Sequence, residues 1–203
     1  METQKQNKSG LLIILSGPSG VGKGTVRRLV MADKSLNLHY SVSMTTRSPR
    51  DREVNGRDYF FVTEKEFIEH IENKDFLEYA RFVDNYYGTP KHYVDKLLEE
   101  GKNVFLEIEV QGAMKAMQLY HGEGLTSIFL VPPSFEELES RIRHRRSETE
   151  EVIHERLSKA QKEMGMKYHY DYCVLNDSVQ RAANEIKKII KQAIKSHQER
   201  MSK

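Results

Sequence analysis

The sequence predicts a protein of the α/β class, built on a parallel sheet of five strands with helices on both faces. Five short apolar runs alternate with segments of helical pattern, and a glycine-rich turn follows the first run directly. Strands buried on both faces read as continuous apolar runs, and strands that alternate with helices pair in parallel. After the second run, a long polar and aromatic segment interrupts the alternation, which predicts an insertion.

The apolar runs give the five expected strands, LLIILS (11–16), HYSVS (39–43), NVFLEIE (103–109), TSIFLV (126–131) and YCVLN (172–176). Helices are expected at about 24–32, 90–101, 111–120, 134–146 and 149–164, followed by a closing helix that Ser178 caps. A short helix inside the insertion should begin with a capping box of Thr63 and Glu66. Pro90 is expected at the first position of its helix, where a missing N–H is tolerated.

One domain over residues 10–190 accounts for this pattern, since a chain of 203 residues is long enough for one compact core. The parts expected are a core at about 10–43, 90–133 and 165–195, an insertion at 44–89 and a helical lid at 134–164. The polar ends, 1–9 and 197–203, are expected to be flexible tails.

Composition limits the classes of function. The 32 Lys and Arg nearly balance the 30 Asp and Glu, so a nucleic-acid partner is not expected. No apolar run reaches the roughly 18 residues of a membrane helix, and no apolar signal segment is present, which favours a cytoplasmic protein without a membrane partner. The single cysteine, Cys173, rules out an internal disulfide and is expected to be buried. A homo-oligomer remains an open alternative.

The glycine-rich turn GPSGVGKGT matches the phosphate-binding pattern G-x-x-x-x-G-K. Its glycines allow successive backbone N–H groups to point at phosphate oxygens, and the following helix turns its positive end to the same anion. Lys23 should reach the β- and γ-phosphates of a nucleotide. The predicted ATP-binding residues are Gly17, Pro18, Ser19, Gly20, Val21, Gly22, Lys23, Gly24 and Thr25.

The loop departs from the usual pattern at one place. The residue after Lys23 is Gly24 instead of Ser or Thr, so the hydroxyl that commonly touches Mg²⁺ is absent there and Thr25 follows one place later. Thr25 is a candidate for an indirect contact with the metal. A guanine-reading N-K-x-D segment is absent from the sequence, which argues against a GTPase.

Five motifs then occur in order: SGPSGVGKGT, SMTTRSPRDREVNGRDYFFV, FLEYARFVDNYYGTP, LEIEVQGA and RRSETEEVIHERLSKAQKEM. Together they closely resemble guanylate kinases of the bacterial type, over roughly residues 10 to 190. The resemblance implies the P-loop nucleoside-monophosphate-kinase fold, with a GMP-binding insertion and a mobile lid. It also implies transfer of the γ-phosphate of ATP to GMP, giving ADP and GDP.

The resemblance assigns the acceptor site to Ser43, Arg47, Arg50, Tyr59, Glu78, Tyr87, Thr89 and Glu107. Guanidinium forks bind phosphate oxygens bidentately, which suits Arg47 and Arg50 to the phosphate of GMP. A carboxylate at Glu78 can accept from both adjacent donors of guanine, N1–H and the 2-amino group, while adenine would leave it mismatched. Arg52 and Arg57 have no such assignment and are expected to be solvated or ion-paired.

The lid and two strand ends supply the remaining implied residues. The lid arginines would neutralise the phosphates, because phosphoryl transfer relies on positioning and charge. The implied catalytic set is Lys23, Arg47, Arg141, Arg145 and Arg156. Mg²⁺ is the expected cofactor and accompanies ATP. Glu109 is a candidate for an indirect contact with this metal. Asn176 is a candidate for a contact with the adenine end of ATP.

Two other functions stay open on the sequence alone. One is a non-catalytic, guanylate-kinase-like interaction module, which would not need Lys23 or the lid arginines. The other is a P-loop kinase for a different small phosphate acceptor, which would need base-reading residues other than Ser43, Glu78 and Thr89.

Overall fold

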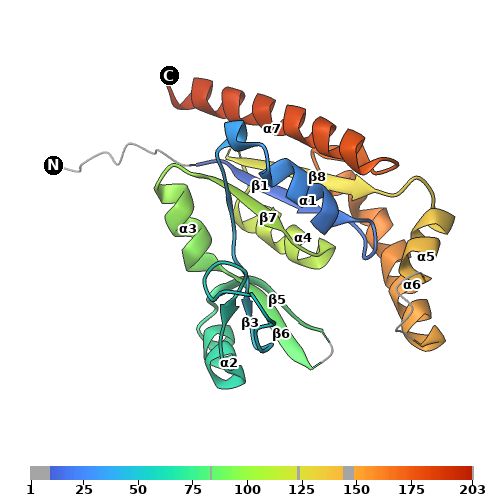
Figure 1. Cartoon of the computed structure of the whole chain (residues 1–203). Coiled ribbons are helices and arrows are strands. Elements are labelled where there is room, and N and C mark those ends of the chain that lie inside the picture. Colours follow the sequence, from blue (N-terminus) through green and yellow to red (C-terminus); the bar gives the residue numbers. More distant parts are fainter. Residues whose placement is uncertain (1–9, 83, 123, 144–148, 203) are drawn as a thin grey trace.

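The computed structural model describes residues 10–82, 84–122, 124–143 and 149–202 (Figure 1). Two sheets organise this part of the chain. The larger is the five-stranded sheet expected from the apolar runs, and the smaller has four strands drawn from residues between 44 and 90. Figure 1 shows the smaller sheet and its helix below the larger one, and the pair α5 and α6 at a separate side.

The core sheet is parallel throughout its described strands. Their spatial order is β2 (Leu38–Tyr40), β7 (Asn103–Glu107), β1 (Leu12–Ser16), β8 (Leu125–Val131) and β9 (Tyr172–Leu175). Side chains of the central strand β1 alternate between two hydrophobic clusters, with Ile13 and Leu15 on one face and Leu12 and Ile14 on the other. All four are fully buried, which explains why this strand reads as an uninterrupted apolar run.

Helices cover both faces of this sheet. The described helices are α1 (Lys23–Met31), α2 (Glu64–Glu72), α3 (Lys91–Glu99), α4 (Val110–Leu119), α5 (Phe135–Arg143), α6 (Glu150–Met164) and α7 (Val179–Met201), with short 3₁₀ turns at Lys34–Leu36 and Gly165–His169. Helices α1 and α7 pack together on one face, and α3 and α4 pack on the other (Figure 1). No helix in the described ranges has the length and apolar character to cross a membrane.

The second sheet has the order β4 (Phe60–Phe61), β3 (Met44–Thr45), β6 (Asn85–Pro90) and β5 (Phe76–Phe82). Strand β3 pairs in parallel with β4 and antiparallel with β6, which in turn pairs antiparallel with β5. Helix α2 is tied to this sheet by Phe67, whose ring stacks on both Phe76 and Tyr86. Strand β5 also packs against α4, so the second sheet contacts the core.

Two capping predictions have different outcomes. The capping box at Thr63 is confirmed, because its hydroxyl accepts from the Glu66 N–H and the Glu66 carboxylate accepts from the Thr63 N–H. Ser178 does hold the N-cap position of α7, but its side chain makes no capping hydrogen bond. Its N–H instead donates to the carboxylate of Asp177, which also pairs with Arg181.

Three other expectations are wrong. Pro90 is the N-cap of α3 and the last residue of β6, so the helix starts one residue later than expected. Cys173 is exposed because β9 is an edge strand of the core sheet. The chain does not become a flexible tail at residue 197, since α7 continues to Met201 and His197 is buried in it. The tail expected at 1–9 lies outside the described residues.

Candidate active site

The phosphate loop connects β1 to α1 at the carboxyl edge of the core sheet. Gly17 and Gly22 have φ values of 148° and 100°, which side chains rarely adopt. A Cβ at Gly17 would also lie 2.5 Å from the Leu130 carbonyl oxygen, so this close approach requires glycine. The loop lines a pocket of about 410 Å³ whose other walls include Arg27, Glu107 and Glu109. Such a pocket can accept a chain of phosphates.

Lys23 starts α1 and turns back over the loop. Its Nζ donates to the carbonyl oxygens of Gly17 and Pro18, at 2.6 and 3.3 Å, and lies 3.5 Å from Oε1 of Glu109. The side chain is 9% exposed. Burial opposes the charge of Glu109, but Lys23 and Lys159 outweigh it and lower the pKa of that carboxyl. The ammonium group of Lys23 therefore lines the pocket beside the ionised carboxylate of Glu109.

Two predicted residues support the loop from outside the pocket. The buried Asn176 donates from Nδ2 to the Val21 carbonyl oxygen at 2.7 Å. Arg141 donates to the same carbonyl at 3.3 Å and to the Asn176 carbonyl at 3.2 Å. The structure thus gives Asn176 a loop-supporting position, while its expected contact with adenine stays a prediction. Arg141 is brought to the loop as expected of a lid arginine.

Helix α6 reaches the loop at Ser19. The Ser19 Oγ accepts from Arg156 at 3.1 Å, and the Ser19 N–H donates to Oε2 of Glu163 at 3.3 Å. Glu163 is 2% exposed, and burial together with the nearby charge of Glu109 raises its pKa. Arg141 and Arg156 therefore meet the phosphate loop from two different helices. Arg145, the third predicted lid arginine, lies outside the described residues.

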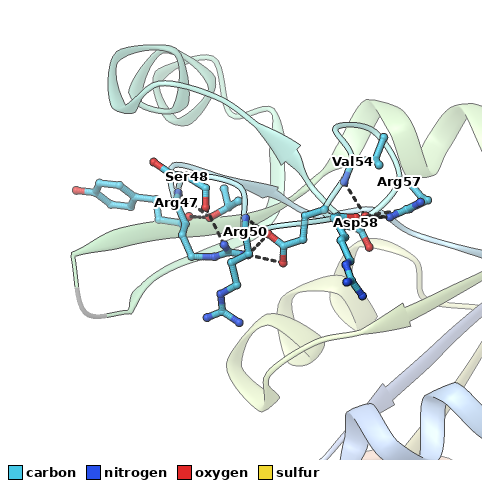
Figure 2. Close-up of polar contacts among 10 residues, drawn as sticks. Arg47, Ser48, Arg50, Val54, Arg57 and Asp58 are labelled. Carbon is cyan, nitrogen blue, oxygen red and sulfur yellow. Dashed lines mark hydrogen bonds and ion pairs between the residues drawn. The ribbon is translucent and has the colours of Figure 1, made fainter.

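The predicted acceptor-phosphate residues lie on and beside the second sheet. Tyr87 is on β6, and Arg47, Arg50 and Tyr59 belong to the segment between β3 and β4. Arg47 donates from one guanidinium nitrogen to both carboxylate oxygens of Glu53, each at 2.9 Å, and from the other to the Ser48 carbonyl. Figure 2 shows this clamp and the Arg50 side chain extending away from the contacts drawn. The backbone N–H of Arg50 joins the network as a donor to Glu53.

Two tyrosines complete this group. The guanidinium of Arg47 lies 5.5 Å from the centre of the Tyr59 ring, and the Tyr59 and Tyr87 rings meet edge to face at 6.0 Å. Burial opposes the charge of Arg47, but hydrogen bonds with Glu53 and Tyr87 outweigh it and raise its pKa. Arg57 is paired with Asp58, as expected for a residue without a site role (Figure 2).

The predicted base-reading acid is held by a cross-strand pair. Glu78 on β5 lies opposite Thr89 on β6, and its Oε1 accepts from the Thr89 hydroxyl at 2.6 Å. Burial is the largest influence on Glu78 and raises its pKa, and the charge of Glu109 adds to the effect. A Cβ at Gly112 on α4 would lie 2.5 Å from Cγ of Glu78, so glycine makes room for this side chain. Ser43 lies next to β3, and its carbonyl accepts from the Phe60 N–H.

Glu107, predicted at the guanine edge, is engaged by a residue that sequence reasoning missed. Its Oε2 lies 2.9 Å from Nε of Arg27, whose guanidinium carbon lies over the Tyr40 ring, 4.4 Å from the ring centre. Burial raises the pKa of Glu107, and the positive charge of Arg27 opposes that rise. No signal in the sequence points to this pair, because the partners lie far apart along the chain and basic residues on a helix usually face water.

The oxygen atoms that line the pocket show whether a metal ion could bind there. Among the described residues, no three His, Cys, Asp or Glu side chains are arranged to hold a metal ion. The pocket does offer Thr25 and the carboxylates of Glu107 and Glu109. Mg²⁺ keeps several waters and is commonly bound through few carboxylates plus substrate phosphates, so these donors fit a metal that arrives with a nucleotide.

Glu53, Gly112 and Glu163 were missed as well. All three stand inside the motifs that carried the resemblance, but only the fold shows that Glu53 supports Arg47 and that Gly112 makes room for Glu78. Glu163 reads as one more charge on an exposed helix, and its burial is a tertiary effect.

A parallel α/β sheet with a phosphate loop, a second sheet that carries the Glu78–Thr89 pair, and helical arginines against the loop define the class of P-loop nucleotide kinases. The family model described as guanylate kinase matches residues 9–193. The chain belongs to the guanylate kinase family.

Known relatives agree with this assignment. A guanylate kinase of Bacillus cereus is 54% identical over 185 residues, which cover 91% of this chain and 89% of the relative. A guanylate kinase of Mesoplasma florum is 53% identical over 89% of this chain, and the match spans only 60% of that relative's length. The crystal structure of guanylate kinase from Anaplasma phagocytophilum is 33% identical, with a TM-score of 0.69 over 91% of this chain and 86% of that one.

Proposed function

We propose that the chain is an ATP:GMP phosphotransferase, which transfers the γ-phosphate of ATP to GMP and yields ADP and GDP. The observation that carries this proposal is the closeness of two different sites. Glu109 contacts Lys23 of the phosphate loop, and its charge raises the pKa of Glu78 in the second sheet. A phosphate-binding loop and a base-reading carboxylate therefore lie within electrostatic reach of one another.

The donor site holds the phosphates of ATP. The loop from Gly17 to Thr25 supplies backbone N–H groups, and Lys23 exchanges its contacts with Gly17 and Glu109 for the β- and γ-phosphates. Arg141, Arg145 and Arg156 bring further positive charge to the transferring group. Asn176 keeps the loop in shape through the Val21 carbonyl and reaches the adenine end of ATP.

The acceptor site holds GMP through its phosphate and its base. Arg47 and Arg50 bind the phosphate with Tyr59 and Tyr87, and Glu53 keeps Arg47 extended toward it. The base is read by a second set of residues, Ser43, Glu78, Thr89 and Glu107. The hydroxyl of Thr89 fixes one oxygen of Glu78, so the carboxylate is already oriented when guanine presents its two donors.

The reaction is a direct displacement at the γ-phosphorus. An oxygen of the GMP phosphate forms a bond to that phosphorus, while the bond to the β,γ-bridging oxygen breaks and that oxygen leaves with ADP. A phosphate monoester has its second pKa near ~6, so the attacking oxygen is largely ionised at neutral pH and needs no strong base. The protein therefore contributes by aligning the γ-phosphate of ATP with the phosphate of GMP and by neutralising their negative charge.

Mg²⁺ is the proposed cofactor, and it enters with ATP. Glu109 and Thr25 would hold its water ligands, and Glu107 would stand behind them at the pocket wall. When bound, the metal supplies charge neutralisation at the β- and γ-phosphates. We also propose a cytoplasmic location, where both nucleotides are available.

The deciding experiment follows ADP formation from ATP and Mg²⁺ with GMP, AMP, CMP, UMP and dTMP offered singly. Among these five acceptors we expect turnover with GMP alone. Some turnover is also expected with dGMP, the deoxy form of GMP. Turnover with another acceptor would keep the phosphate loop in its role and overturn the assignment of Glu78. A folded protein that binds GMP without turnover would instead favour a non-catalytic interaction module.

A further inference from the structure

Arg27 is a cation of the donor pocket that the proposed reaction does not use. It lies on α1 four residues after Lys23, so both side chains lie on one face of the helix. Helical side chains lean toward the N-terminus of their helix, which brings Arg27 back toward the phosphate loop. It lines the same pocket as Lys23.

The guanidinium of Arg27 is held from two sides. Its Nε lies 2.9 Å from Oε2 of Glu107, and its central carbon, Cζ, lies over the Tyr40 ring at 4.4 Å from the ring centre. Burial raises the pKa of Tyr40 to about 12, so the ring stays neutral and gives a stable platform. A guanidinium carries five N–H donors, more than one carboxylate can accept, and the side chain keeps 29% of its surface exposed.

The neighbours of Arg27 belong to both the proposed donor site and the proposed acceptor site. Glu107, its partner, ends β7 two residues before Glu109, which contacts Lys23. On the other side, the charge of Arg27 acts on Tyr59, a proposed ligand of the acceptor phosphate. Arg27 thus lines the pocket of the phosphate loop and lies within electrostatic reach of Tyr59.

We propose that Arg27 is a further catalytic residue, which binds phosphate oxygens where the γ-phosphate of ATP meets the phosphate of GMP. The proposal rests on the proposed function. Two phosphates that approach for transfer repel one another, and a planar guanidinium can donate to oxygens of both at once. Glu107 and Tyr40 fix the fork before the substrates arrive, so little side-chain order is lost on binding.

The test compares Arg27→Met, Arg27→Lys and the matched control Arg57→Met, an exposed arginine paired with Asp58. In Arg27→Met, kcat should fall about 10²-fold, the scale of one lost donor to a transition-state oxyanion. The dissociation constant of GMP, measured by calorimetry, should rise about tenfold, since a charged hydrogen bond is lost. The control should keep both values within about twofold, as surface changes usually do.

Arg27→Lys separates phosphate binding from simple neutralisation of Glu107. Lysine restores the charge beside that acid but lacks the planar fork, so it should recover only part of kcat. Full recovery by lysine, or kcat of Arg27→Met within about twofold of the parent, would overturn the proposal. A parent protein that lacks turnover would refute the proposed function instead, and the calorimetric affinity for GMP would still decide whether Arg27 binds its phosphate.

Discussion

The core sheet and the second sheet place their site residues by different means. In the core, the phosphate loop takes its shape from backbone conformation and from the buried strands β1 and β8, on which Gly17 packs directly. In the second sheet, side chains hold one another, as in the Arg47–Glu53 clamp and the Thr89–Glu78 hydrogen bond. The phosphate loop therefore depends first on its backbone, with side-chain contacts such as that of Asn176 added to it, while the predicted acceptor residues depend mainly on individual polar partners. Substitutions should act differently in the two regions.

The largest effect is expected in the core, at Lys23. Lys23→Ala removes the cation at the floor of the pocket and leaves Glu109 without its nearby charge partner on the loop. We expect kcat to fall by about 10²- to 10³-fold, because a donor directed at transition-state charge is lost. ADP formation measures the effect, and circular dichroism checks the fold. Turnover close to that of the parent would remove Lys23 from the mechanism.

The next effect is expected at Glu78 of the second sheet, the proposed base-reading acid. Glu78→Gln keeps an oxygen for the Thr89 contact but replaces the other acceptor with an amide, which faces a donor of guanine. We expect kcat/KM for GMP to fall about 10²-fold, because a buried donor pair is left unmatched. Steady-state kinetics with varied GMP measures this loss. The affinity for ATP should not change.

Two results for Glu78→Gln would contradict this prediction. Equal kinetics with GMP in the variant and the parent would show that Glu78 does not read the base. A loss of affinity for ATP as large as that for GMP would instead indicate that the donor and acceptor regions are not energetically separate.

The same contrast explains which elements could be predicted from the sequence. Strand β1 is recognisable because its apolar run is local and uninterrupted, and the phosphate loop follows a fixed spacing. Strands β3 and β4 have only two residues each, and β3 is held in part by the Thr45 hydroxyl donating to the distant Tyr86 carbonyl. Such short strands exist because of tertiary contacts, so periodicity cannot reveal them.

The same distinction between local sequence patterns and tertiary contacts separates the site residues that could be predicted from those that could not. Lys23, Arg47 and Glu78 stand in motifs with recognisable spacing, which a resemblance can assign. Their supports could not be predicted in this way. Arg27 was missed because it meets the predicted Glu107 only where α1 packs against β7, and Glu163 becomes a loop contact only when α6 packs on the core. Residues to which the resemblance assigns a contact with substrate were thus easier to predict than residues whose position depends on tertiary packing.

A smaller effect is expected where one such support is removed. Glu53→Gln weakens the clamp on Arg47 and the turn closed by the Arg50 N–H. We expect KM for GMP to rise about two- to fivefold, the scale of a partly exposed ion pair, with kcat unchanged. Steady-state kinetics with varied GMP measures it. A lower KM would mean that Glu53 competes with the substrate phosphate for Arg47 and does not position it.

The smallest effect on activity is expected at the capping box of α2. Thr63→Ala removes the hydroxyl that accepts from the Glu66 N–H, and the Glu66 carboxylate loses its hydroxyl partner. Loss of an N-cap typically costs about 1 kcal/mol, which for a domain of this size lowers Tm by roughly 2–4 °C. Thr63→Ser, which keeps the hydroxyl, is the matched control and should restore Tm. KM for GMP should not change, because the hydrogen bonds described for Arg47, Glu78 and Thr89 involve no residue of α2. A rise in KM for GMP with an unchanged Tm would contradict this, and it would show that α2 positions the acceptor site as well as supporting the second sheet.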